Sequence, residues 1–167
     1  MKEKPSKTST TKLPRVVRLD DLDTQVFPRC AHPGEWAVPG SFIFWDQDLP
    51  RLSRKPQQAF AQGFLGLDSF GWSTLVVVAQ ITLTELDQVT RRLAQHLIDF
   101  HGAPDLTAAL PAAREEIEFA VSLCDHELNT LIAMQRSYEN QAIRERFRVV
   151  LPATAVNHEH LRLWGVE

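Results

Sequence analysis

The sequence predicts an α+β domain, with a mixed or antiparallel sheet of four to five strands and helices packed mainly on one face. Segments of β-rich apolar residues occur beside segments whose apolar residues recur at helical spacing, so both element types are expected. These segments do not alternate strictly, which disfavours a doubly wound parallel sheet. The length of 167 residues suits one hydrophobic core rather than two.

The composition argues against several functional classes. A formal charge of −3 provides no electrostatic reason to expect nucleic acid or an anionic membrane as partner. The longest apolar run, Leu75–Ala79, is far shorter than the roughly 20 residues that span a bilayer. The first residues contain no apolar signal segment, and two cysteines cannot build a disulfide framework. We therefore expect a cytoplasmic protein without nucleic-acid or membrane partners.

Composition also divides the chain into three parts. Residues 1–13 are polar, basic and rich in Ser and Thr, and they are expected to form a disordered arm. Residues 14–151 form the single α+β domain. Residues 152–167 have no clear pattern and are expected to be a tail, which can dock through apolar side chains at Leu161, Leu163 and Trp164.

In the first half of the domain, Val16–Leu19 is a candidate strand and Glu35–Asp46 a candidate β-hairpin. Pro39 and Gly40 suit a type II turn within it, because proline presets φ and glycine accepts positive φ. Pro56 suits the first turn of a helix. This helix is expected to bury Phe60 and Phe64 and to end at Gly66.

The second half begins with a strand over Thr74–Thr82. Thr84–Asp87 resembles a capping box and starts a helix with an apolar stripe that ends at Phe100. Pro111 suits the first turn of a second helix, whose last apolar position is Cys124. Asn129–Tyr138 is a further strand. A final helix is expected from Asn140, with core positions Ile143, Phe147, Val150 and Leu151.

Two Cys-x-His pairs raise the hypothesis of a metal site built from Cys30, His32, Cys124 and His126. These are ligand types that Zn²⁺ accepts, but one intervening residue makes joint chelation tight, and the long separation indicates nothing about proximity. The favoured interpretation makes Cys124 a small buried hydrophobe and His126 a residue of the following turn. A nucleophilic Cys124 is a weaker alternative, because a helix C-terminus raises the pKa of a thiol.

Aromatic residues beside glycine and proline turns are the more informative feature. The segment Gly63–Trp72 either walls a pocket or exposes an anchor for a protein partner; the alternative is a loop packed over the sheet. The candidate partner-binding or pocket residues are Trp36, Trp45, Phe64, Phe70 and Trp72. Four arginines near the end of the domain suggest either a basic patch or a solvated face: Arg136, Arg144, Arg146 and Arg148.

Three segments together resemble a known family: "PGEWAVPGSFIFWD" (33–46), "GFLGLDSFGWSTLV" (63–76) and "SLCDHELNTLIAMQRS" (122–137). They resemble the bacterial domain of unknown function 6505, over about residues 13–150. The resemblance implies a bacterial, cytosolic, single-domain protein and transfers no catalytic residues. It also implies that the segment around Cys124 belongs to the family pattern, whereas that around Cys30 does not. It further points to a biotin- or lipoate-related or other multi-component enzyme system as the source of a partner.

The sequence contains no recognisable combination of nucleophile and base, no cofactor-binding motif and no pair of acidic or basic residues at a spacing typical of catalysis. We therefore predict a non-catalytic accessory or protein-interaction protein that needs no cofactor and binds a protein partner. The alternative is a small-molecule or metal-binding protein, which includes the possibility of an enzyme, with its pocket near Gly63–Trp72 and Cys124–His126.

Overall fold

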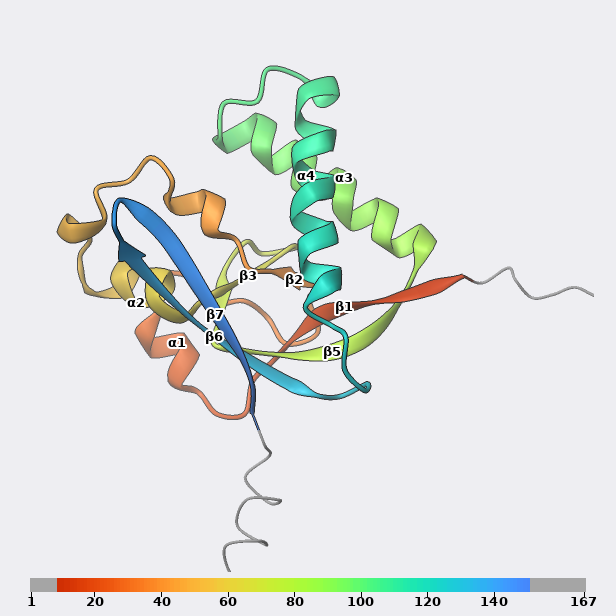
Figure 1. Ribbon diagram of the computed structural model, residues 1–167, viewed down its shortest axis with the longest axis horizontal. Coiled ribbons are helices and arrows are strands. Elements are labelled where there is room, and N and C mark those ends of the chain that lie inside the picture. Colours follow the sequence, from red (N-terminus) through yellow and green to blue (C-terminus); the bar gives the residue numbers. More distant parts are fainter. Residues whose placement is uncertain (1–8, 151–167) are drawn as a thin grey trace, which may run out of the picture.

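The computed structural model of the protein describes residues 9–150 (Figure 1). Its main sheet is antiparallel, and its four strands lie in the order β1-β5-β6-β7. These strands are β1 (Thr10–Val17), β5 (Leu75–Thr82), β6 (Leu131–Glu139) and β7 (Ala142–Val150). A smaller antiparallel sheet has the order β2-β3-β4, with β2 (Ala37–Val38), β3 (Phe64–Gly66) and β4 (Trp72–Ser73). The predicted α+β class is confirmed.

The helices gather at two places on this frame. α3 (Leu83–Phe100) and α4 (Leu106–Ser122) pack against each other and contact β5 and β1. α1 (Leu22–Val26) contacts α2 (Arg54–Gln62), which packs on β6. Two short 3₁₀ helices, η2 (Ser41–Phe44) and η3 (Leu49–Arg51), precede α2. Figure 1 shows α3 and α4 together at one end of the molecule, with α1 and α2 on the other side.

Strand β5 contributes apolar side chains to two core clusters, as its sequence pattern predicts. Val76 and Val78 are fully buried in the cluster that also contains Phe64 and Cys124. Ile81 is buried in the larger cluster beneath α3 and α4, which includes Leu93 of α3. An apolar strand with both faces covered is expected at an interior position of a sheet, and β5 occupies one between β1 and β6.

The first strand is longer than its sequence suggests. β1 begins at Thr10, inside the segment predicted to be a disordered arm, because Thr10, Thr11 and Lys12 pair with the backbone of the end of β5. Backbone pairing makes no demand for apolar side chains, so the polar composition of the segment conceals it. Residues 1–8 of the predicted arm and the predicted tail at 152–167 lie outside the described residues.

The hairpin expected over Glu35–Asp46 is wrong in its second half. Gly40 has a positive φ of 82°, as the predicted turn requires, but the chain then enters η2 instead of a strand. Strand β2 pairs with β3 rather than with its own continuation. The 3₁₀ turn places Phe44 in the core, where its ring lies 5.2 Å from each of the rings of Phe60 and Trp72.

The helix that contains Phe60 does not extend to Phe64. α2 ends at Gln62, and Phe64 is the first residue of β3. Gly63 terminates the helix, although Gly66 was the predicted terminator. A Cβ atom at Gly63 would lie only 2.8 Å from both the Ala59 carbonyl and the Trp72 ring, so the contact requires glycine.

Both long helices begin earlier than predicted. Thr82, rather than Thr84, caps α3 by accepting a hydrogen bond from the Glu85 amide at 3.1 Å. Asp105 caps α4 by accepting one from Ala108 at 3.0 Å, so Pro111 lies inside the helix. Because these caps satisfy amide groups that would otherwise lack partners, they decide the helix starts more strongly than proline does.

The final predicted helix is a strand. Asn140 and Gln141 have positive φ values of 51° and 61°, which is the geometry of a two-residue type I′ turn, and β7 then pairs along the whole of β6. Side chains of β7 alternate between half-buried Ile143 and Phe147 and the exposed arginines. This period of two was hidden by the four-residue spacing that Ile143 and Phe147 also have.

Arg136 of β6 joins α2, η2 and β7 from inside the protein. Its side chain is fully buried and donates to the carbonyl oxygens of Pro39 and Phe60, both at 2.7 Å. It also donates to Ser41 Oγ at 3.0 Å and to Glu145 Oε2 at 3.3 Å. Weaker bonds of 3.2–3.3 Å reach the carbonyls of Gly63 and Ala59. Arg136 therefore belongs neither to a basic patch nor to a solvated face, whereas Arg144, Arg146 and Arg148 are exposed.

We expect Arg136→Met to lower the free energy of unfolding by about 3–5 kcal/mol, because Glu145 and several carbonyls would lose a buried cationic partner. Urea unfolding measures this loss. Arg146→Met on the exposed face of β7 is the matched control and should stay within about 0.5 kcal/mol of the wild type. An Arg136→Met protein as stable as the control would contradict the role assigned to this side chain.

We expect Gln141→Gly to stabilise the protein by about 1 kcal/mol, because glycine adopts the positive φ of the β6–β7 turn without the cost that an L side chain carries. Thermal unfolding at equal protein concentration tests this. Gln141→Ala retains the conformational cost and should give no comparable gain. Equal melting temperatures for the glycine and alanine variants would refute the turn geometry.

Candidate functional site

The structure separates the five predicted aromatic site residues. Phe64 and Trp72 are buried, at 0% and 6% exposure, and belong to the core. Trp36 is 8% exposed and borders a pocket. Trp45 is 74% exposed, and Phe70 is half-buried. Phe64 and Trp72 are therefore structural residues, and only the other three contribute to candidate binding sites.

Trp45 and Phe70 belong to a connected group of rings that we call the aromatic surface. Its six members are Phe42, Trp45, Phe70, His96, Phe100 and His101. The ring of Phe42 lies 6.5 Å from Trp45 and 5.4 Å from His101. His96 stacks on Phe70 at 3.8 Å with an interplanar angle of 2°, and it also neighbours Phe100 and His101. The surface thus joins the end of η2, the Gly63–Trp72 segment and the end of α3.

An apolar groove of about 360 Å³ opens beside this surface. Trp45 and Phe42 lie on one side, and α4 contributes three alanines, Ala108, Ala109 and Ala112. The groove is also lined by Asp46, Leu97, His101, Gly102 and Ala103. Phe100, at the end of the predicted helix stripe, is 72% exposed. Two large aromatic side chains therefore face solvent in one region of the protein.

The two histidines of the aromatic surface are neutral at pH 7. Burial, followed by the neighbouring His101, lowers the pKa of His96 to about 4. Burial also lowers the pKa of His101 below its ordinary value, although Asp46 opposes this effect. Neutral imidazoles add little charge to a surface that is otherwise apolar. The arrangement suits contact with an apolar group rather than with an anion.

The two Cys-x-His pairs do not assemble into one site in the part of the chain that the structure describes. Within residues 9–150, no group of three or more His, Cys, Asp or Glu side chains is arranged to hold a metal ion. Cys30 accepts a hydrogen bond from Arg18 at 2.8 Å. Burial raises the pKa of Cys124 to about 12, so its thiol is a poor nucleophile and a poor metal ligand at neutral pH. The core position predicted for Cys124 agrees with its 2% exposure.

Within residues 9–150, no hydrogen bond or ring contact joins the His126 side chain to the Gly63–Trp72 segment. Its carbonyl accepts a hydrogen bond from Lys12 at 2.6 Å, and its side chain lines a separate hollow with Leu123 and Phe147. Among the pockets described, none combines Cys124–His126 with the aromatic loop. Two separate features involve residues of the Gly63–Trp72 segment: the aromatic surface, which includes Phe70, and a pocket beside Trp36, which Leu67 and Asp68 also line.

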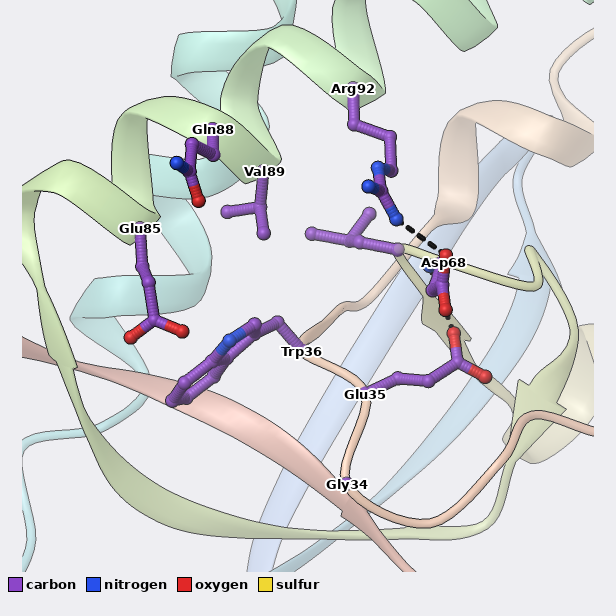
Figure 2. A pocket seen from close by; sticks show the side chains of 9 residues that line it. Gly34, Glu35, Trp36, Asp68, Glu85, Gln88, Val89 and Arg92 are labelled. Carbon is purple, nitrogen blue, oxygen red and sulfur yellow. Dashed lines mark hydrogen bonds and ion pairs between the residues drawn. The ribbon is translucent and has the colours of Figure 1, made fainter.

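The Trp36 pocket lies between the first half of α3 and the loops that flank the small sheet, and its volume is about 240 Å³ (Figure 2). One wall consists of four α3 residues at the spacing of one helix face: Glu85, Gln88, Val89 and Arg92. The opposite wall consists of Gly34, Glu35, Trp36, Leu67 and Asp68. Arg92 forms an ion pair with Asp68 across the opening.

Glu35 holds the second wall in place. Its carboxylate accepts hydrogen bonds from the amides of Asp68 and Ser69, at 2.9 and 2.8 Å, and from Ser69 Oγ and the His32 amide. Burial alone would raise the pKa of Glu35, but these hydrogen bonds outweigh it and hold the pKa below its ordinary value of 4.5. The charge is satisfied inside the wall, so Glu35 positions the loops rather than serving as a free acid or base.

Sequence reasoning missed most residues of both features. Glu85, Gln88 and Arg92 were absent from the candidates because exposed polar residues on a helix carry no distinctive signal. His96, Phe100 and His101 were missed too. His96 and Phe100 are four residues apart and share one face of the helix, but the spacing of Leu97 and Phe100 also placed Phe100 in the predicted apolar stripe, so the sequence did not indicate its exposure.

We expect Glu35→Gln to lower the free energy of unfolding by about 1–3 kcal/mol at pH 7, because a charged acceptor of several hydrogen bonds is lost. The folded-state pKa lies below the ordinary value, so the stabilisation is present above pH 4.5 and is lost as the pH falls below it. Urea unfolding of both proteins from pH 7 to pH 3 should therefore show a shrinking difference. Glu118→Gln, on an exposed part of α4, is the control, and a constant difference throughout would contradict the role of Glu35.

Comparison with known proteins assigns the chain to a family but to no function. In residues 9–150, no helix has the length and apolar character needed to cross a bilayer. No curated protein and no solved structure matches the chain. The model of a family of unknown function, DUF6505, matches residues 11–162. The chain therefore belongs to the DUF6505 family.

Proposed function

We propose that the protein is a non-catalytic interaction protein that binds a partner protein through the aromatic surface. The observation that carries this proposal is the exposure of Trp45 and Phe100, at 74% and 72%, beside an apolar groove. Large aromatic side chains are enriched among the residues that dominate binding energy at protein interfaces, and clustered exposed apolar area marks such interfaces.

The aromatic surface is supported from beneath, which favours binding because little ordering is needed. The Gly40 amide donates to Glu116 of α4 at 2.9 Å, and Ser41 donates to Glu145 while accepting from Arg136. These contacts hold the start of the turn that leads to Trp45. A preorganised anchor loses less conformational entropy on binding than a mobile one.

The lining of the groove indicates the chemistry of the partner. Three alanines leave space for an apolar side chain between α4 and Trp45, and Asp46 lies at the same groove. Asp99 precedes Phe100 on the exposed end of α3. The occupant that we propose is therefore an apolar side chain of a partner protein, flanked by lysine or arginine residues that complement these carboxylates.

We place this interaction in the bacterial cytoplasm, since both cysteines are free and reduced thiols fit that compartment. The partner would belong to a larger enzyme system that the protein assists. Components of biotin- or lipoate-related systems are the first partners to test.

We expect Trp45→Ala to weaken binding to a purified partner at least about tenfold, because truncation of a central aromatic anchor typically costs more than 1.4 kcal/mol. Partners captured by the wild-type protein would be identified by mass spectrometry, purified and measured by calorimetry. Leu22→Ala is the matched control, since Leu22 is 58% exposed and lies on α1, outside the aromatic surface.

Two outcomes would refute the proposal. Partners that bind Trp45→Ala and Phe100→Ser as tightly as the wild type would place the interface elsewhere. A dimer seen by sedimentation and abolished by Trp45→Ala would show that a second copy, rather than a different protein, occupies the surface. Both variants should retain wild-type stability within about 0.5 kcal/mol, because the side chains are exposed.

A further inference from the structure

We propose that the Trp36 pocket binds a small neutral group in which a hydrogen-bond donor adjoins an acceptor, as in an amide, lactam or ureido group. This site shares no residue with the aromatic surface. The pocket uses the first half of α3, whereas the aromatic surface uses its end.

The first supporting observation is the indole N–H of Trp36. The residue is 8% exposed, and its indole nitrogen makes no hydrogen bond to any residue in the described range 9–150. Figure 2 shows this nitrogen on the side of the ring that faces α3. A buried N–H without an acceptor is costly, and buried tryptophans usually find a partner. An acceptor atom of a ligand in the pocket would supply it.

The second observation is the set of polar groups that α3 places across from Trp36. Glu85 and Gln88 both line the pocket, and within the described chain neither side chain forms an ion pair or hydrogen bond. Figure 2 shows the Glu85 carboxylate opposite the indole ring. This carboxylate can only accept hydrogen bonds, so it requires a donor from the ligand. The Gln88 side-chain amide can either donate or accept a hydrogen bond.

The charges around the pocket select a neutral ligand. An anion would be repelled by the Glu85 carboxylate, and the Arg92 guanidinium, which would offset this repulsion, is already paired with Asp68. A cation would leave the Trp36 N–H without an acceptor, and the Arg15 guanidinium already lies 4.4 Å from the centre of the indole ring. A neutral group with adjacent donor and acceptor satisfies Glu85 and Trp36 together.

The size and rigidity of the pocket fit such a group. Its volume of about 240 Å³ is several times the roughly 30 Å³ that one water molecule occupies in the liquid. Leu67 and Val89 supply apolar contact beside the polar groups. The Trp36 carbonyl accepts from the Leu67 amide at 2.7 Å, and the Glu35 carbonyl accepts from Val16 at 2.7 Å. The indole is therefore held in place before a ligand arrives.

Nuclear magnetic resonance of protein labelled with ¹⁵N at the indole nitrogens tests the proposal directly. Trp36→Phe assigns the Trp36 signal by its disappearance. Pyrrolidinone and uracil serve as free small-molecule probes, and a short peptide with one glutamine serves as the probe for an amide carried by a protein. We expect the Trp36 signal to shift in a saturable manner with at least one probe at millimolar concentration, while the signal of exposed Trp45 stays unchanged. The responding arm identifies the source of the group.

The variant Glu85→Ala adds a test that does not depend on the fold of the core, since Glu85 is exposed on α3. Loss of a hydrogen bond to a charged group should weaken probe binding about tenfold or more. Glu118→Ala on α4 should leave the affinity unchanged. The proposal is overturned if no probe shifts the Trp36 signal, or if Glu85→Ala binds the effective probe as tightly as the wild type.

Discussion

The fold depends on one buried charge, the guanidinium of Arg136. This group donates hydrogen bonds to the carbonyl oxygens at the end of α2 and at Pro39, to the Ser41 hydroxyl and to the Glu145 carboxylate. It therefore joins α2, η2, β6 and β7. Burial lowers the pKa of Arg136, whereas Glu145 opposes that effect. A buried guanidinium is tolerated only when its donors are satisfied, which here requires several segments to meet at one point.

The same network extends to the surface. Burial raises the pKa of Glu116, which accepts from the Gly40 amide, and Gly40 leads directly into η2 and Trp45. Interior polar contacts thus decide where an exposed aromatic side chain lies. Glu35 plays a comparable part at the Trp36 pocket, because its carboxylate gathers amides from two loops into a fixed wall. Buried Arg136 thus positions the η2 turn, and buried Glu35 positions the pocket wall. The groups that remain available to bind a partner or ligand are uncharged or exposed.

The sequence was most informative where one signal was unopposed. The apolar run of β5 predicted a buried strand, and the stripe of α3 predicted a helix that ends before Gly102. Errors arose where two patterns overlapped: Phe60 and Phe64 are four residues apart and suggested one helix, yet Gly63 separates a helix from a strand. Ile143 and Phe147 misled in the same way. Pairing with β6 across a two-residue turn makes that segment a strand, and the four-residue spacing of the two side chains hid its period of two.

By itself, the sequence determined the α+β class, the central apolar strand, the long amphipathic helices and the burial of Cys124. These properties follow from composition and periodicity, which act over a few residues. The tertiary structure alone decided that Arg136 is buried, that Trp45 is exposed while Phe64 and Trp72 are not, and that Trp36 meets α3 across a pocket. The physical reason is that burial and hydrogen-bond satisfaction depend on contacts between distant segments. The local sequence around an aromatic or arginine residue therefore does not determine whether its side chain lies in the core or on the surface.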